Sequence, residues 1–359
     1  MAATAMVGNR ARGRVGGLAA LGAVLALAAC GAPATSGPAP TVTARAEVVA
    51  DKQAVPAPEV PPVWPLTGVA GQPDPRPAIA VKIENTSAAR PQSGLEQADV
   101  VWETIVEFEV SRFVAVFHSQ APEEIGPIRS VRPMDPLIVA PLHGMLVFSG
   151  GQPGILAEAA ASGAQIISHD AGAPGLHRVS SRSAPHNVYG SLSTWWGIAE
   201  AGRTAPGEQF VFARSAERAA AVTGGTPAGT LDFRLSGQSH PVWSWDAGSG
   251  TWLRSEGSSP ATAASGARLS AVNVVAITAG HPNTGYGAQG GAPVPTYELV
   301  GSGDAVIATG GQTIAARWQK DAADQPMRLF LPDGSAATLA PGNTWVELVP
   351  AGSGSLTIS

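Results

Sequence analysis

The pattern of apolar and polar residues in the first half of the chain predicts a strand-rich domain. Residues 78–83 form a nearly unbroken apolar run, which is typical of a strand covered on both faces. Residues 99–118 indicate two further strands that are joined near Glu109. Along the first of these, Glu103, Glu107 and Glu109 fall on alternate positions. Because side chains alternate between the two faces of a strand, these acids are predicted to share one face.

A strand–helix–strand unit is predicted next. Residues 145–148 and 165–168 have the composition of short buried strands, and residues 154–161 favour a helix between them. A parallel strand pair with this crossover places the segment from Ser149 to Gly151 at a carboxyl end of the sheet. Open α/β sheets tend to bind ligands at that edge.

The pattern changes after residue 229 to short apolar runs separated by Gly, Pro, Asp and Ser. The predicted strands are residues 272–277, 296–300, 306–308, 314–318, 327–331 and 345–349. Gly310-Gly311 lies between two of them, where a tight hairpin turn is expected. The sequence therefore predicts an α+β protein. A mixed α/β, sandwich-like N-terminal domain (residues 64–214) precedes a smaller all-β C-terminal domain (residues 229–359).

The N-terminus has the features of an export signal. Three arginines between residues 10 and 14 precede an apolar stretch over residues 15–28. That stretch is too short for a stable transmembrane helix but suits a secretory signal. It ends in Leu-Ala-Ala-Cys, and Cys30 is the only cysteine of the chain. This string resembles the lipobox of bacterial lipoproteins, whose cysteine is acylated. We therefore expect a signal peptide over residues 1–29 and a chain lipid-anchored through Cys30 to the outer face of the cytoplasmic membrane.

Composition narrows the classes of partner. Residues 30–63 include seven prolines and no apolar periodicity, which predicts a disordered tether.

Without residues 1–29 the chain has 19 Lys and Arg against 27 Asp and Glu, a net charge of −8. Such a chain is repelled by nucleic acid and by anionic headgroups, so neither is an expected partner. Membrane attachment must then come from acyl chains.

Several strings resemble those of the YerB-like lipoprotein family, whose biochemical function is unknown. They are IAVKIEN (79–85), PQSGLEQADVVWE (91–103), SRF (111–113), GPIRSVRP (126–133), SGGQP (149–153), APHNVY (184–189), WSWDAGSGTWLRSEG (243–257), AVNVVAI (271–277), IAARWQK (314–320) and GNTWVELVP (342–350). The resemblance implies a membrane-tethered protein with a mixed α/β domain followed by a β-rich domain. The family usually has two glycines after the position of Glu107, where this chain has Phe108 and Glu109.

The GPIRSVRP string is the best candidate for a binding site. Pro127 and Pro133 restrict the backbone on both sides, which predicts a turn or loop. On a turned backbone Arg129 and Arg132 can converge on a phosphate or a carboxylate through bidentate hydrogen bonds. The alternative is an internal salt-bridge network in which these arginines pair with acids, namely Glu103, Glu107 or Asp135.

His186 and Asn187 lie on a second loop, which Pro185 helps to fix. They could orient a ligand, transfer a proton or simply stabilise the loop. The histidines near His186 do not have the spacing of a zinc motif, so no metal is expected. No nucleotide-binding loop is present either, so no cofactor is expected.

These observations favour a binding protein of the cell envelope over an enzyme. The expected ligand is an anionic envelope component, such as an anionic wall polymer, or a wall-associated protein. The alternatives are an enzyme that acts on wall glycan and a scaffold that regulates a wall-remodelling enzyme. No catalytic residue can be assigned. The expected ligand-binding residues are Arg112, Arg129, Arg132, His186, Asn187, Glu103, Glu107 and Asn85.

Overall fold

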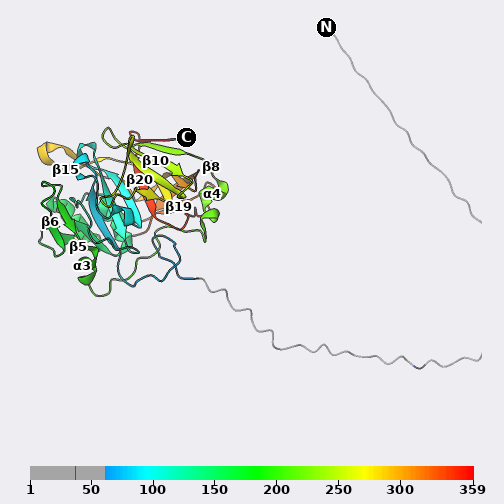
Figure 1. Cartoon of the computed structure of the whole chain (residues 1–359), viewed down its shortest axis with the longest axis horizontal. Helices are drawn as coiled ribbons and strands as arrows, with labels where there is room; N and C mark the ends of the chain where they lie inside the picture. Colours follow the sequence, from blue (N-terminus) through cyan, green and yellow to red (C-terminus); the bar gives the residue numbers. More distant parts are fainter. Residues whose placement is uncertain (1–36, 38–60) are drawn as a thin grey trace, which may run out of the picture. The chain divides into compact units, whose positions relative to one another are not determined.

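A computed structural model describes residue 37 and residues 61–359. The predicted signal peptide, Cys30 and most of the predicted tether therefore lie outside the described residues. Residues 61–359 form one compact unit built mainly of two β-sheets with a few short helices (Figure 1). Among the described helices, none has the length and apolar character needed to cross a membrane.

The larger sheet has 11 strands and contains residues from both halves of the chain. In spatial order its strands are β19 (Arg328–Phe330), β18 (Gln312–Lys320), β17 (Gly301–Thr309), β14 (Asn273–Ala279), β20 (Thr344–Pro350), β2 (Val100–Ile105), β3 (Ser111–Phe117), β1 (Ile79–Glu84), β4 (Met145–Phe148) and β5 (Gln165–Ser168), and β8 (Thr226–Pro227) pairs with β18. The halves join where β2 and β20 run parallel, with Val101 opposite Trp345. The sheet is thus continuous across the boundary between the two predicted domains.

The smaller sheet has six strands and comes entirely from the second half of the chain. In spatial order its strands are β12 (Ser259–Pro260), β11 (Thr251–Glu256), β10 (Pro241–Asp246), β9 (Thr230–Arg234) and β21 (Ser355–Ile358), and β13 (Ser270–Ala271) pairs with β11. It packs on the middle of the larger sheet, where the buried rings of Trp243 and Trp345 meet edge to face at 5.2 Å. A core of buried side chains therefore lies between the two sheets.

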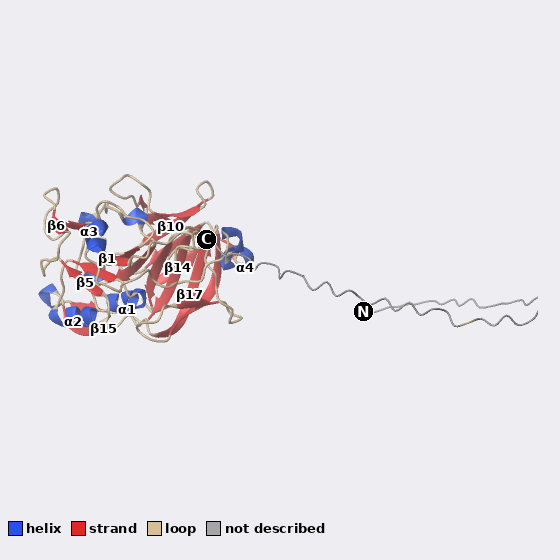
Figure 2. Cartoon of the chain, turned by 90° about the horizontal axis from the view of Figure 1, so that it is seen from below, coloured by secondary structure: helices blue, strands red, loops and turns tan. Residues whose placement is uncertain are grey.

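Helices and hairpins cover the ends of the larger sheet. The helices are α1 (Asp135–Val139), α2 (Pro153–Ala161), α3 (Leu192–Gly197) and α4 (Ala220–Gly224), and the separate hairpins are β6 (Leu176–Arg178) with β7 (Val188–Gly190) and β15 (Asn283–Gly287) with β16 (Pro293–Pro295). Figure 2 shows α1, α2 and α3 around the end formed by β1 and β5, whereas α4 lies at the opposite end.

The predicted α+β class, with a mixed first part and a strand-rich second part, is confirmed. The strand–helix–strand unit matches β4, α2 and β5, and β4 and β5 are parallel as expected. Gly310 and Gly311 form the turn between β17 and β18, with φ angles of 62° and 71°. Both central residues of a two-residue hairpin turn need such positive φ angles, which glycine adopts readily.

Two expectations about strands are wrong. Residues 296–300 form no strand. Within this segment Tyr297 is buried, and its hydroxyl donates to the Leu348 carbonyl at 3.0 Å. The face shared by Glu103, Glu107 and Glu109 does not exist, because β2 ends at Ile105. Residues 107–109 instead form a tight turn, so the side chains of Glu107 and Glu109 point in different directions.

Candidate functional site

Most of the predicted site residues meet in one cleft, which we call the arginine cleft. It has a volume of about 590 Å³. It is lined by Glu84, Thr86, Glu107, Phe108, Val110, Arg112, Arg129, Ser130, Arg132, Gly151, Gln152, Asp170, His186, Gly287, Ala288 and Gln289. Five of the eight predicted residues are in this set, although they come from four separate segments of the chain.

The fold brings the three arginines together at the carboxyl ends of β1 and β4. Arg112 lies near the start of β3, directly opposite Glu84 at the end of β1. The loop that carries Arg129 and Arg132 lies across these strand ends, because Arg129 N donates to the Lys82 carbonyl at 2.8 Å. The same loop contacts β4, since Ser149 N donates to the Arg129 carbonyl at 3.0 Å. The sequence predicted this edge of the sheet as a place for ligands.

Glu107 is held between two of the arginines. Its carboxylate accepts from Arg132 Nε at 2.5 Å, from Arg132 Nη2, and from Arg112 Nη2 at 3.0 Å. Burial alone would raise the pKa of Glu107, but the hydrogen bond from Arg132 and the charges of both arginines outweigh it and lower the pKa to about 2. Arg112 and Arg132 are therefore largely engaged inside the protein, as the predicted salt-bridge alternative requires.

Arg129 differs from the other two because its guanidinium is only lightly engaged. Its one side-chain partner among residues 61–359 is Glu84, at 3.4 Å from Nε, and Nε itself is buried without a hydrogen bond. The side chain is 24% exposed. Its two Nη groups are therefore donors available to a group that enters the cleft.

Glu84 organises this side of the cleft, and the sequence analysis missed it. The His186 Nδ1 lies 2.9 Å from Glu84 Oε2, and the Thr86 hydroxyl donates to Oε1 at 3.0 Å. Glu84 thus fixes His186 beside Arg129. The available signal was its place in the IAVKIEN string at the end of a predicted strand.

A buried ion pair lies next to the arginines. Lys82 Nζ donates to Asp135 Oδ1 at 2.7 Å and to the Thr104 hydroxyl at 3.0 Å. The other oxygen of Asp135 accepts from Arg132 N at 2.7 Å. Burial lowers the pKa of Lys82 to about 8, although the charge of Asp135 opposes the change. Because both side chains are fully buried, this pair supports the cleft and is not exposed to a ligand.

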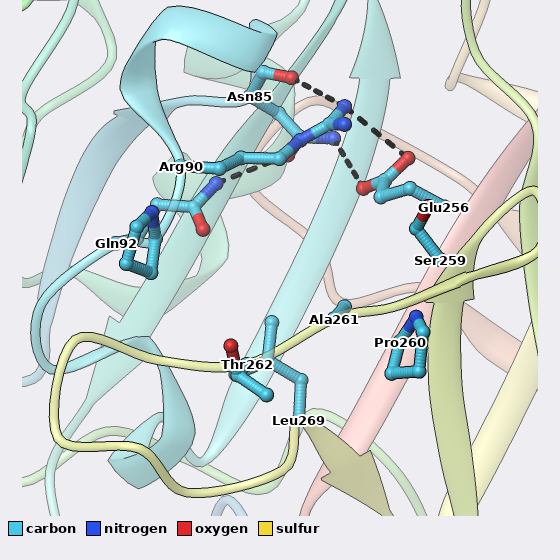
Figure 3. Close-up of a pocket in the computed structure, with 10 residues that line it drawn as sticks. Asn85, Arg90, Gln92, Glu256, Ser259, Pro260, Ala261, Thr262 and Leu269 are labelled. Atoms are coloured by element: carbon cyan, nitrogen blue, oxygen red, sulfur yellow. Dashed lines mark hydrogen bonds and ion pairs between the residues drawn. The ribbon is translucent and has the colours of Figure 1, made fainter.

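Three predicted residues lie outside the arginine cleft. Asn187 fixes its own loop, since its side chain accepts from Arg178 at 2.7 Å. Asn85 lies in a smaller pocket, where it donates to Glu256 and accepts from Arg90, each at 3.0 Å (Figure 3). That network joins the first half of the chain to β11. Glu103 is fully buried between the two sheets.

Glu103 belongs to a buried cluster centred on Arg254 of β11. Arg254 is fully buried and donates at 2.5 Å to both Glu103 and Glu256. Its guanidinium carbon lies 5.2 Å from the centre of the Trp345 ring. Glu347 of β20 lies opposite Glu103 of β2. The Glu347 carboxyl accepts a hydrogen bond from the Trp243 indole N–H at 2.9 Å.

The two neighbouring carboxyl groups of this cluster titrate differently. Burial and the charge of Glu103 raise the pKa of Glu347 well above its usual range. Burial would also raise the pKa of Glu103, but the charge of Arg254 lowers it. Of the two carboxyl groups, Glu347 is therefore the one that holds a proton to higher pH. When protonated, its Oε2, which has no hydrogen-bond partner among residues 61–359, can donate to Glu103. The cluster joins the two sheets. Its Glu103, Arg254 and Glu347 are fully buried and not accessible to a ligand, whereas Glu256 lines the smaller pocket of Figure 3.

The turn after β2 has an unusual backbone and an exposed ring. Phe108 and Glu109 have φ angles of 62° and 59°, in the left-handed region that costs a non-glycine residue roughly 1–2 kcal/mol. These are the positions where the family resemblance implies two glycines. The Phe108 side chain is 59% exposed, so burial of the ring does not offset that cost. Sequence reasoning identified the departure but not the exposed ring.

A second cleft lies beside the same turn. It has a volume of about 630 Å³ and is lined by Ile105, Val106, Glu107, Phe108, Glu109, Arg234, Leu235, Ser236, Gly237, His281, Asn283, Ala292, Pro293, Pro295, Pro350 and Ser353. Glu107 and Phe108 line both clefts, so the two clefts adjoin at this turn.

Metal ligands are not grouped in the described part of the chain. Residues 61–359 contain no set of three or more His, Cys, Asp or Glu side chains placed to hold a metal ion. Of the histidines, His186 pairs with Glu84, and His169 lies 3.1 Å from the neighbouring Asp170.

Two family models match consecutive parts of the chain. Residues 66–205 match the N-terminal domain of a protein of unknown function, DUF3048, and residues 231–346 match its C-terminal domain. Together these matches cover most of the described residues. The chain belongs to the DUF3048 family. The two models follow the order of the two domains that the resemblance implied.

Two comparisons place this DUF3048 protein among known relatives. It is 35% identical over 130 residues to the Bacillus subtilis (strain 168) protein named "Putative lipoprotein YerB". That match covers 35% of this chain and 39% of the relative, so it spans about two fifths of the relative's length. The crystal structure of the YerB protein from Bacillus subtilis matches with a TM-score of 0.68 and 23% identity, over 82% of this chain and 99% of that one. The structural match shows a shared fold.

Proposed function

We propose that this DUF3048 protein is a membrane-tethered binding protein of the cell envelope whose arginine cleft holds an anionic group. The observation that carries the proposal is the state of Arg129. It is the cleft arginine whose Nη groups have no partner among the described residues, and its side chain is partly exposed. A phosphate or carboxylate oxygen can accept from both Nη groups at once.

Other groups in the cleft support an anion beside Arg129. Gly151 and Gln152 line the cleft and directly precede α2, a nine-residue helix. The first residue of α2, Pro153, has no N–H group. The other N–H groups of its first turn have no intrahelical partner and carry a partial positive charge. His186, fixed through Nδ1 by Glu84, leaves its Nε2 for a ligand. Because Glu107 engages Arg112 and Arg132, the cleft suits a single charged group more than an extended polyanion.

Export and lipid attachment complete the proposal. The relative named as a lipoprotein supports attachment to a membrane. Cys30 is the residue that the sequence identifies for acylation, with the folded unit then on the outer face of the cytoplasmic membrane. The expected ligand is an anionic envelope component that presents one charged group to the cleft, such as a single unit of an anionic wall polymer.

Removing Cys30 should release the chain from the membrane. One or two acyl chains supply about 0.8 kcal/mol for each buried methylene, and the negative net charge offers no substitute attraction. We expect Cys30→Ala to move the protein from the membrane fraction to the soluble or secreted fraction of a bacterial host, measured by fractionation and immunoblotting. Retention of Cys30→Ala in the membrane fraction would contradict the assignment.

Arg129→Gln is expected to weaken anion binding at least tenfold. Pyrophosphate is the probe, and calorimetric titration of the full chain in detergent micelles is the measurement. A tenfold loss corresponds to about 1.4 kcal/mol, within the range of one charge-assisted hydrogen bond. The thermal midpoint should change little, because Arg129 makes one long ion pair.

Arg317→Gln is the matched control for that titration. Arg317 is 59% exposed on β18, and its ion-pair partner among the described residues is exposed Asp304. Its loss should therefore leave pyrophosphate binding unchanged. Equal affinity for the wild-type protein and Arg129→Gln, or no binding by the wild-type protein at millimolar pyrophosphate, would refute an anion site in the cleft.

A further inference from the structure

The ring of Phe108 is largely exposed to solvent. It is the most exposed large hydrophobic side chain among the described residues, at 59%. It also occupies a left-handed backbone position, with φ 62° and ψ 21°. Residues held in such sparsely populated conformations concentrate at ligand sites, where the surrounding structure fixes them.

The surrounding structure fixes this turn on both sides of Phe108. On one side Glu107 is bound by Arg112 and Arg132 in the arginine cleft. On the other side the Glu109 carbonyl accepts from the Ser236 hydroxyl at 2.5 Å, and the Glu109 carboxylate accepts from Gly237 N at 3.2 Å. The ring is therefore presented from a rigid support at the point where the two clefts adjoin.

The two sides of the ring differ in chemistry. The arginine cleft offers the free donors of Arg129. The second cleft offers proline rings and uncharged polar groups, including Pro293, Pro295 and Asn283. Its charged lining residues are Arg234, Glu107 and Glu109, so it has no excess of positive charge for a second anionic group. A ligand that touches both clefts is elongated, with one anionic group at one end and an uncharged, hydroxyl-bearing part at the other.

We infer that Phe108 is a stacking platform for a sugar ring of an anionic glycan whose charged group lies against Arg129. This inference rests on the proposed function and names the ligand class of the same cleft. The face of a phenyl ring carries partial negative charge and attracts the C–H groups on the flat face of a sugar. The sugar hydroxyls would then reach polar groups of the second cleft, and a phosphate or a carboxylate on that sugar would reach Arg129.

Phe108→Gly separates this role from a structural one, because the two roles predict opposite effects. Glycine adopts a positive φ without strain, so the thermal midpoint should rise by about 2–4 °C. The affinity for a phosphorylated disaccharide should nevertheless fall at least tenfold. Affinity for inorganic pyrophosphate, which has no ring to stack, should stay within twofold of wild type. Phe108→Trp keeps an aromatic face and should retain most of the disaccharide affinity.

The experiment is a calorimetric titration of the full chain in micelles with three probes: pyrophosphate, a phosphorylated disaccharide and a disaccharide bearing a uronic acid. The two disaccharides distinguish phosphate from carboxylate as the charged group. Val300 is 47% exposed, so Val300→Gly controls for the loss of an exposed apolar side chain. This variant should bind all three probes with wild-type affinity.

The outcomes separate this inference from the proposed function. If pyrophosphate binding depends on Arg129 and Phe108→Gly still binds a disaccharide as wild type does, the stacking platform is refuted and the anion site stands. If the wild-type protein does not bind millimolar pyrophosphate, or if Arg129→Gln binds it with wild-type affinity, the proposed function fails. This inference then fails with it. Loss of disaccharide binding in Phe108→Gly alone, with pyrophosphate binding intact, is the result that we predict.

Discussion

Replacing Arg254 by methionine is expected to lower the free energy of unfolding by about 3–5 kcal/mol. Arg254 is fully buried between the two sheets, where it neutralises Glu103 and Glu256. Methionine fills similar space but leaves the Glu103 carboxylate buried without its cation. Urea denaturation followed by tryptophan fluorescence measures the change, because Trp243 and Trp345 lie beside the guanidinium.

Two carboxyl variants of the same cluster are expected to change the free energy of unfolding differently. Glu103→Gln removes the anion that Arg254 needs, so a loss of similar size is expected. Glu347→Gln should be neutral or stabilising at pH 7, because glutamine imitates a protonated Glu347 that accepts from Trp243 and donates to Glu103.

The pH dependence of Glu347 has a definite sign. The pKa of Glu347 is raised in the folded state, so above about pH 4.5 the folded chain holds a proton that the unfolded chain releases. Wild-type stability should therefore decline as pH rises above that value, and Glu347→Gln should remove this decline. Equal destabilisation by Glu103→Gln and Glu347→Gln would show that the proton is not placed on Glu347.

Replacing Glu107 by glutamine is expected to cost about 2–3 kcal/mol of stability at pH 7. Burial opposes the charge of Glu107, but Arg132 and Arg112 hold its pKa at about 2, below the ordinary value of 4.5. The unfolded chain therefore binds the proton first as pH falls. The stabilisation is complete above about pH 4.5 and is lost between pH 4.5 and 2. Chemical denaturation over pH 2–7 should show this loss in the wild type and a flatter profile in Glu107→Gln.

Glu107→Gln also tests the relation between ion pairs and binding. It frees Arg112 and Arg132 in the cleft, so pyrophosphate should restore part of the lost stability by binding the folded state. Glu298→Gln, a carboxylate outside both clefts, is the control and should show neither the loss nor the rescue. A flat wild-type profile between pH 4.5 and 2 would contradict the assigned role of Glu107.

The sequence predicted the structural elements whose residues lie close together along the chain. The β4–α2–β5 unit and the Gly310-Gly311 hairpin follow from residues close together in the chain, and both were found. The pairing of Val101 with Trp345 could not be predicted, because nothing near either residue specifies a partner so distant in sequence. The continuous sheet is a consequence of such pairings.

The candidate site was predictable to a similar degree. Proline-bounded Arg129 and Arg132 were found, since two prolines and two arginines in eight residues form a recognisable string. Glu84 was missed, because its partners Arg129 and His186 meet it only in the folded chain. Glu103 was misplaced for the same reason, since its partner Arg254 lies on the second sheet.

The most direct test of the central claim is a crystal structure of the chain with the phosphorylated disaccharide bound. The account predicts ligand density in the arginine cleft, with a phosphate oxygen within about 3.2 Å of an Arg129 Nη atom and a sugar ring over Phe108. A ligand bound elsewhere, or a cleft in which the Arg129 Nη groups contact only Glu84, would contradict it.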